Sequence, residues 1–192
     1  MTQNQDFSVQ IQQQLTRAVE TLRAGGVIAY PTEYCFGLGC DPRNKHSVER
    51  LLEVKQRAAT QGVILIAANL TQVEDYAELD GLSKLERIQA SWPGPNTWLL
   101  PAKPHVPTWV RGKHTTIAMR IPGHALSQAL CRDFGHAIVS TSANRHGQPA
   151  LLTTESVVAE LGEELDFVLD APVGGAASAS TIRDAISGEI LR

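Results

Sequence analysis

Short apolar runs alternate with amphipathic segments along most of this chain of 192 residues, and this alternation is the strongest restriction on its fold. Residues 63–67 form a continuous, largely β-branched run, which is typical of a strand covered on both faces. Residues 9–24 instead repeat apolar side chains at helical spacing and end at Gly25 and Gly26, which favour a helix stop. Because strands and helices alternate in this way, the sequence predicts an α/β fold with a mostly covered sheet.

The other expected elements follow the same two patterns. Longer helices are predicted over residues 9–24, 44–55, 125–134 and 154–161, and two short helices are expected at the capping-box patterns of residues 71–74 and 83–86. Strands are predicted over residues 27–30, 63–67, 97–102, 115–121, 137–141, 167–169, 180–183 and 189–191. Residues 32–42 are expected to be irregular, and the proline-rich residues 101–107 are expected to form a surface loop.

The charge balance and the apolar pattern disfavour several classes of protein. With 17 basic and 20 acidic residues the net charge is -3, which disfavours a protein that mainly coats nucleic acid but allows a local basic pocket. The longest apolar run, residues 63–68, is far shorter than the ~20 residues that span a bilayer, and residues 1–14 are too polar for an export signal. The sequence therefore predicts a cytoplasmic protein without a membrane segment.

The cysteines and glycines indicate neither a metal centre nor a standard nucleotide loop. Cys35, Cys40 and Cys131 cannot all pair with one another, so reduced thiols are expected. Cys35 and Cys40 have no further Cys and no His near them, which makes a poor zinc site, and no metal held by protein side chains is expected. Gly37 and Gly39 lack the third glycine of a dinucleotide turn, so any bound phosphate must be held largely by side chains.

Lys55 and Arg57 stand at the predicted end of the helix over residues 44–55. Side chains two positions apart diverge on a helix but share a face in extended chain. The two cations can therefore converge on one anion only if the helix ends near Lys55. In the alternative, both are solvated charges that the C-terminal end of a helix favours.

Polar side chains also follow or end two of the predicted strands. Residues 140–144, Ser-Thr-Ser-Ala-Asn, come directly after residues 137–139, at the strand end where ligands gather in open α/β sheets, although a plain turn is the alternative. Strand alternation places Arg120 on the same face as Thr116, among apolar neighbours. A guanidinium there needs an anion, which is either an internal carboxylate or the carboxylate or phosphate of a ligand.

Six motifs, in this order, resemble the YrdC/Sua5 family, and the match is closest to its short bacterial form. They are PTEYCFGLGCDP (31–42), KQR (55–57), WPGP (92–95), TIAMRIP (116–122), STSAN (140–144) and STIRD (180–184). The resemblance covers nearly the whole chain, and the ordered combination of K-x-R with S-x-N is its specific part. It implies a YrdC-like fold with a twisted mixed sheet covered by helices. Residues 1–192 would form a single domain without the C-terminal extension of longer family members.

The resemblance also implies an enzymatic activity. Such proteins make L-threonylcarbamoyladenylate and diphosphate from L-threonine, bicarbonate or CO2, and ATP with Mg²⁺. The product passes to the proteins that transfer the threonylcarbamoyl group to A37 of tRNAs reading ANN codons, and a weak contact with RNA is allowed. Carried over by position, the catalytic residues would be Lys55, Arg57, Ser142 and Asn144. Those that hold ATP would be Lys55, Thr116, Ser142 and Arg192, and those around threonine would be Thr32, Arg120, Ser140 and Ser180.

Two departures from the family pattern affect only the expected loop shapes. Tyr34 stands where Thr or Ser is common, and Ala58 and Ala59 follow the K-x-R motif where Pro is common. A different class of function also remains open: a non-catalytic module that binds structured RNA or ribosomal particles through the same basic pocket. The negative net charge disfavours this alternative. Release of pyrophosphate from ATP, when threonine and bicarbonate are both supplied, distinguishes the two.

Overall fold

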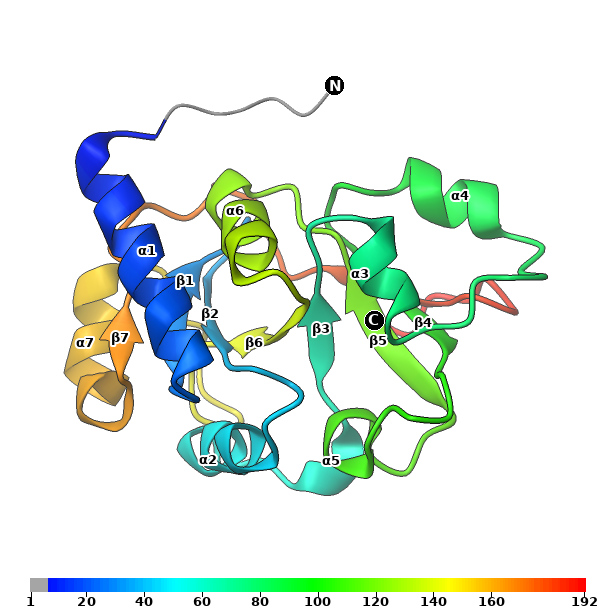
Figure 1. Cartoon of the computed structure of the whole chain (residues 1–192), viewed down its shortest axis with the longest axis horizontal. Coiled ribbons are helices and arrows are strands. Elements are labelled where there is room, and N and C mark those ends of the chain that lie inside the picture. The colour runs from blue at the N-terminus through cyan, green and yellow to red at the C-terminus, as the bar shows by residue number, and fades with distance from the viewer. Residues whose placement is uncertain (1–6) are drawn as a thin grey trace.

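A mixed sheet of eight strands runs through the structure, a computed structural model that describes residues 7–192 (Figure 1). The strands are β1 (Ile28–Pro31), β2 (Phe36–Gly39), β3 (Ile64–Ile66), β4 (Asn96–Pro101), β5 (Thr116–Arg120), β6 (Ile138–Ser142), β7 (Phe167–Val168) and β8 (Thr181–Asp184). Their order across the sheet is β7-β1-β2-β6-β3-β5-β4-β8. The pairs β1/β7, β3/β5 and β4/β8 are parallel, and the other neighbours are antiparallel. The predicted α/β fold is therefore confirmed.

Helices cover this sheet within the described residues. They are α1 (Val9–Arg23), α2 (Lys45–Lys55), α3 (Leu70–Glu74), α4 (Leu85–Ala90), α5 (Thr108–Arg111), α6 (Ala125–Phe134) and α7 (Thr154–Leu161), with short 3-10 turns η1 (Ala59–Gln61) and η2 (Gly162–Glu164). The longer predicted helices all form. None of the described helices is long and apolar enough to cross a membrane. Residues 1–6 of the polar N-terminal stretch lie outside the described residues.

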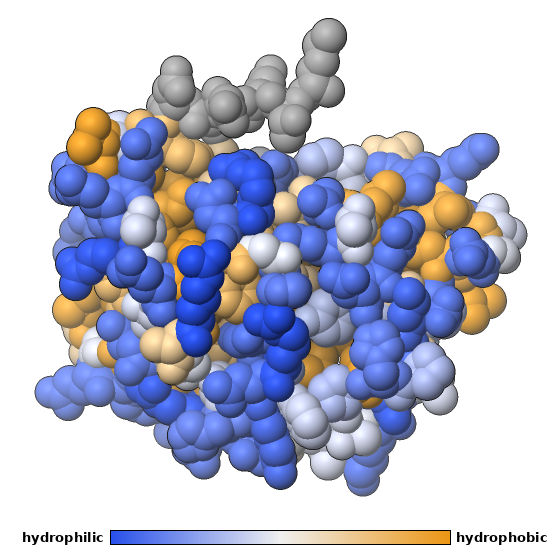
Figure 2. All heavy atoms as spheres, viewed as in Figure 1, coloured by the Kyte–Doolittle hydropathy of each residue, from blue (hydrophilic) through white to orange (hydrophobic). Residues whose placement is uncertain are grey.

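The sheet separates two apolar clusters, because alternate strand residues point to opposite faces. On one face α1 and α6 lie side by side and bury Leu22 and Leu130 against Ile28, Ile66 and Ile138 (Figure 1). The larger cluster, on the other face, includes α2 and residues from β2, β3, β5 and β6. Each fully buried Leu or Ile contributes about 1.5–3 kcal/mol, so these two clusters hold the sheet in place. Hydrophilic side chains dominate the outer surface in Figure 2.

Strand β2 forms where the sequence predicts an irregular segment. Its two glycines suggested a break, but both are accommodated because Tyr30 of β1 lies over them. A Cβ atom on Gly39 would lie 2.7 Å from a ring carbon of Tyr30, and one on Gly37 would lie 3.2 Å from another. The Tyr30 ring, together with Val139 O at 2.9 Å, fills the space of a side chain at position 39, so the strand requires glycine there, whereas a side chain at position 37 would need a small shift of its neighbours.

Both predicted short helices form, but their capping residues differ from the prediction. Helix α3 begins at Leu70 with Asn69 as its cap, and α4 begins at Leu85 with no side-chain cap, so Thr71 and Ser83 do not cap these helices. Helix α5 was not predicted, since four residues are too few to show a helical period. Residues 189–191 form a single bridge, from Ile190 to Arg183, in place of a strand.

Candidate active site

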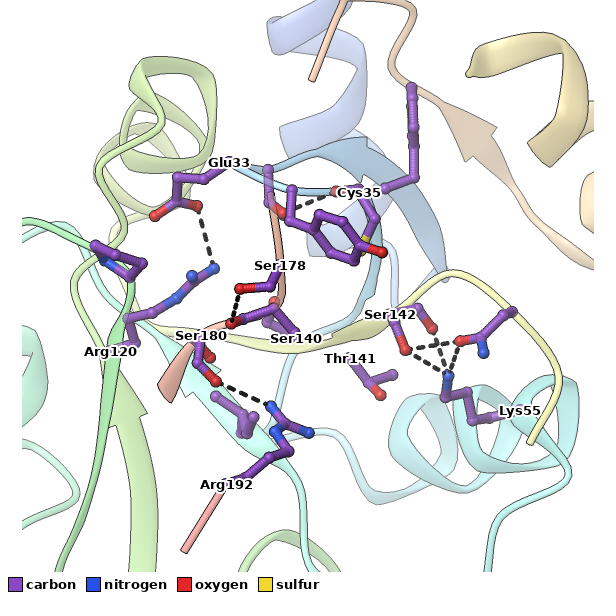
Figure 3. Close-up of a pocket in the computed structure, with 18 of the residues that line it drawn as sticks. Glu33, Cys35, Lys55, Arg120, Ser140, Thr141, Ser142, Ser178, Ser180 and Arg192 are labelled. Atoms are coloured by element: carbon purple, nitrogen blue, oxygen red, sulfur yellow. Dashed lines mark hydrogen bonds and ion pairs between the residues drawn. The ribbon is translucent and has the colours of Figure 1, made fainter. Parts of the chain in front are cut away.

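One cavity of about 380 Å³ collects polar side chains from distant parts of the chain. Its walls come from the β1–β2 turn, the end of α2, the ends of β5 and β6, residues 178–180, and Arg192. Figure 3 shows Lys55 and Ser142 at one end of this cavity and Glu33 and Arg120 at the other, with Ser140 between them. The cavity therefore has two chemically distinct ends.

Lys55 and Arg57 both line the cavity because helix α2 ends between them. Gln56, directly after the last helical residue, has the left-handed conformation with φ 52° and ψ 45°. The Gln56 N–H donates to Glu53 O (2.9 Å) and the Arg57 N–H donates to Leu52 O (3.0 Å), which is the Schellman pattern of a helix end. A left-handed residue other than glycine costs about 1–2 kcal/mol, and at Gln56 it directs the side chains of Lys55 and Arg57 toward the same cavity. Helix α2 therefore ends at Lys55, as the convergence of Lys55 and Arg57 on one anion requires.

Lys55 is a buried cation held by neutral oxygen atoms. Its Nζ atom donates to Ser142 O (2.6 Å) and Ser142 Oγ (2.9 Å), and also to Asn144 Oδ1. Ser142 Oγ in turn donates to Asn144 Oδ1 at 2.7 Å. Burial, followed by the nearby Arg57, lowers the pKa of Lys55 to about 8. Within residues 7–192 no carboxylate forms an ion pair with Lys55, so its charge is available to an anionic ligand.

Arg57 and Arg192 add positive charge to the same region. Arg57 donates to Gln61 Oε1 (3.1 Å) and to Gly62 O (2.9 Å), and burial and then Arg192 lower its pKa. The C-terminal residues turn back along β8, where Ile182 N–H donates to Arg192 O at 2.9 Å. This return places the Arg192 side chain against Ser180 O at 3.4 Å. Cations that repel one another across a shared cavity are stabilised by a ligand that carries several negative charges.

Arg120, at the opposite end, faces an internal carboxylate. Its guanidinium lies 3.3 Å from Glu33 Oε2, and both residues line the cavity. The Gly123 N–H donates to the other Glu33 oxygen at 2.7 Å, which fixes that carboxylate. Arg120 is 7% exposed. Arg120 therefore has an internal carboxylate as partner, and because it also lines the cavity, a contact with a ligand carboxylate stays a prediction.

Hydroxyl groups line the space between the two ends. Thr32 Oγ1 donates to Cys35 O at 2.7 Å, and Ser180 Oγ lies 2.8 Å from Thr97 Oγ1. Ser140 is 7% exposed and faces the cavity. Of the predicted site residues, Thr116 alone does not line the cavity. Thr116 is the first residue of β5 and pairs with Pro101. It lies four residues before Arg120, which is too far along the strand to reach the cavity.

Some lining residues were not assigned by the sequence analysis. The position of Glu33 directly after a predicted strand is a signal that marks it as a candidate site residue. No comparable signal in the sequence marks Gln61 or His146, which also line the cavity. Ser178 lies on a segment that crosses from β7 to β8, at opposite edges of the sheet. This segment is anchored by Gly174 N–H to Thr32 O (2.9 Å) and Ala176 N–H to Glu33 O (2.8 Å). Its position depends on sheet order, which the sequence did not specify.

The described residues contain no group of three His, Cys, Asp or Glu side chains suited to hold a metal ion. Among residues 7–192, Glu33 is the only acidic residue that lines the cavity, and Arg120 and Gly123 already engage it. The three cysteines are buried, and none forms a disulfide. The polar groups of the cavity are therefore suited to bind anions and hydroxyl groups.

Comparison with known proteins identifies the family of this chain. A family model for Sua5, YciO and YrdC proteins, described as "Telomere recombination", matches residues 20–192. A threonylcarbamoyl-AMP synthase of Xylella fastidiosa (strain 9a5c) is 49% identical over 93% of this chain and 96% of its own length. One of Vibrio cholerae is 47% identical over the same share of both chains.

Solved structures show the same fold. P. abyssi Sua5 complexed with L-threonine superposes with a TM-score of 0.83 and 28% identity, over 88% of this chain and 50% of that chain. The chain thus spans about half the length of the solved Sua5 protein. E. coli YciO superposes with a TM-score of 0.80 and 26% identity, over 94% and 90% of the two chains. The chain belongs to the Sua5/YciO/YrdC family.

Proposed function

We propose that this protein is a threonylcarbamoyl-AMP synthase, a nucleotidyltransferase that makes L-threonylcarbamoyladenylate and diphosphate from L-threonine, bicarbonate or CO2, and ATP. The observation that carries this proposal is one cavity with a guanidinium among hydroxyl groups at one end and, at the other, cations that form no ion pair with a carboxylate of residues 7–192. The names of relatives that are 47–49% identical over nearly their whole length support it. A non-catalytic RNA-binding role has no such support.

The cationic end suits the phosphates of ATP. Lys55, Arg57 and Arg192 line it, and within the described residues none of them forms an ion pair with a carboxylate. In nucleotidyl transfer, charge builds on the phosphoryl oxygens and on the departing pyrophosphate. Cations that are already in position stabilise this charge without reorganising at the moment of reaction. Ser142 and Asn144 hold the Lys55 ammonium group in that position. ATP contact by Thr116 remains a prediction from the family pattern.

The guanidinium end suits an amino acid. Arg120 would bind the threonine carboxylate, and Thr32, Ser140 and Ser180 would surround the rest of the molecule. The similar P. abyssi Sua5 was solved with L-threonine, which supports an amino-acid site in this family fold. The amine would combine with CO2 to form a carbamate, whose oxygen attacks the α-phosphate of ATP. No protein nucleophile is required for this sequence of steps.

Mg²⁺ would arrive with ATP. The described side chains of the cavity offer hydroxyl and amide oxygens but no carboxylate apart from Glu33, which Arg120 engages, so they fit an ion that is coordinated mainly by substrate phosphates and water. When bound, the ion would neutralise phosphate charge. The protein's own part would be to hold Lys55, Arg57 and Arg192 around those phosphates.

The remaining expectations follow from this activity. The adenylate would be passed to the proteins that complete the modification of A37 in tRNAs reading ANN codons, and the protein would act in the cytoplasm, with at most weak contact to RNA.

An omission experiment tests the proposal. Pyrophosphate release from Mg-ATP is measured with L-threonine and bicarbonate together and with each left out. Release should require both, because the attacking carbamate exists only after they combine. Release that continues without threonine would contradict the proposal.

A further inference from the structure

The hydroxyl of Tyr30 is a buried polar group that finds no hydrogen-bond partner in the described part of the chain. Tyr30 is 1% exposed, and its Oη atom makes no hydrogen bond of normal geometry within the described residues. A buried hydroxyl left in this state costs about 1–3 kcal/mol, whereas phenylalanine would fill the same space at no such cost. The hydroxyl therefore needs an explanation beyond packing.

The sheet directs this hydroxyl toward the amino-acid end of the cavity. Tyr30 of β1 pairs with Gly37 of β2, and its ring lies over Gly37 and Gly39. A Cβ atom on Gly37 would lie 3.3 Å from Tyr30 Oη, so the hydroxyl reaches across β2 where no side chain blocks it. Strand β2 pairs in turn with β6, which carries Ser140.

Ser140 is the polar side chain closest to hand for a hydrogen bond with the Tyr30 hydroxyl. Burial raises the pKa of Tyr30 far above its usual range, and the Ser140 side chain is near enough to offset part of that rise. The antiparallel pairing of Gly37 with Ser142 and of Leu38 with Thr141 brings Gly39 beside Ser140, so the Tyr30 ring that lies over Gly39 is near Ser140. The Tyr30 hydroxyl nevertheless makes no hydrogen bond within residues 7–192. Ser140 lines the cavity beside Arg120, while Tyr30 itself does not line it.

We propose that Tyr30 is a positioning residue whose hydroxyl donates to Ser140 Oγ and thereby directs the Ser140 proton toward the carboxylate of the bound amino acid. Ser140 and Arg120 would then grip that carboxylate from two sides. A serine hydroxyl rotates freely, and a donor behind it removes the orientation in which its own proton points away from the ligand. This inference rests on the proposed amino-acid site, and it assigns a role to a residue outside the cavity wall.

The variant Tyr30→Phe tests it, because only one oxygen atom is removed. The KM for L-threonine should rise by about three- to tenfold, as expected for one lost hydrogen bond, while the KM for ATP stays within about twofold. The melting temperature should not fall. Tyr76→Phe is the matched control, since Tyr76 is also buried but lies in the core away from the cavity. It should leave both KM values unchanged.

A double-mutant cycle shows whether Tyr30 acts through Ser140. In the Ser140→Ala background, Tyr30→Phe should have no further effect on the KM for L-threonine, since the hydroxyl it orients is gone. Equal fold-changes in both backgrounds would overturn the proposal. An unchanged threonine KM in Tyr30→Phe, or equal changes in the KM values of threonine and ATP, would also overturn it.

Calorimetric titration with L-threonine alone separates this inference from the proposed function. If the wild type binds threonine but releases no pyrophosphate, the proposed function fails, and weaker binding to Tyr30→Phe still supports the positioning role. Equal threonine binding by the wild type and Tyr30→Phe overturns the positioning role whatever the activity.

Discussion

Lys55 Nζ lies 2.9 Å from Ser142 Oγ, although 87 positions separate the two residues in the chain. This contact joins the end of α2 to the end of β6 and holds a cation with neutral oxygens. Because no carboxylate among the described residues pairs with it, the charge of Lys55 is directed at whatever enters the cavity.

Replacing Lys55 or Arg57 with alanine should lower turnover by roughly two to three orders of magnitude and leave a folded protein, because each removes a preorganised positive charge that stabilises the developing phosphoryl charge. The double variant should lose less than the product of the two single losses, as is found for residues that act as a unit. Pyrophosphate-release kinetics and thermal melts of the three variants measure both effects.

Lys45→Ala is the matched control for these variants, since Lys45 lies on the same helix with its side chain 61% exposed. It should retain wild-type turnover. If Lys55 and Arg57 only stabilised the end of α2, their loss would change stability by about 0.3–1 kcal/mol and leave turnover alone.

The pH dependence should show the lowered pKa of Lys55. In the free enzyme kcat/KM for ATP should fall as pH rises through about 8, because the ammonium group loses its proton there. Stability should change in the opposite direction. Between about pH 8 and the ordinary lysine value of 10.5, the unfolded chain binds more protons at this site, so its contribution to stability rises with pH.

The variant Lys55→Arg tests the assignment of this pH dependence, because a guanidinium keeps its charge throughout that range. Its kcat/KM profile should lack the fall near pH 8, whatever its absolute activity. An identical fall in the variant would assign the titration to another group.

Arg120→Ala should raise the KM for L-threonine by roughly 10- to 100-fold, the effect of losing a hydrogen bond to a charged group, and leave ATP affinity nearly unchanged. Since removal of Arg120 also leaves Glu33 without its partner, Arg120→Lys serves as a second variant that retains the positive charge. Binding isotherms for both ligands decide the outcome. A collapse of ATP affinity with intact threonine affinity would assign Arg120 to the nucleotide.

L-serine should be a poor substrate, because it has the hydroxyl of threonine but lacks the methyl group. One missing methyl in a pocket is worth about 1–3 kcal/mol in specificity. Comparison of kcat/KM for the two amino acids measures this difference. Equal values would contradict a pocket shaped for threonine.

Part of this site can be predicted from local sequence because the decisive geometry is local. The convergence of Lys55 and Arg57 depends on where one helix ends, and strand alternation alone puts Arg120 on the face that carries the cavity. The partner of Arg120 could not be identified from the sequence, because the carboxylate of Glu33 and that of a ligand would bind a guanidinium in the same way. Strand β2 was missed because its glycines fit a strand only once the Tyr30 ring covers them.

Other parts depend on long-range order that no local pattern encodes. Ser178 reaches the cavity because β7 and β8 occupy opposite edges of the sheet, so the connection between them crosses the site. Arg192 reaches it because the last residues turn back along β8. Both placements follow from strand pairing between segments far apart in the chain.

Direct detection of the product tests the central claim, that one cavity joins the three substrates. The protein is incubated with Mg-ATP, L-threonine and ¹³C-labelled bicarbonate, and the quenched mixture is analysed by mass spectrometry. The wild type should form a threonylcarbamoyl-adenylate that carries the label, and Lys55→Ala should form far less of it at the same protein concentration. Pyrophosphate without a labelled adenylate, or equal amounts of product from the wild type and Lys55→Ala, would contradict the claim.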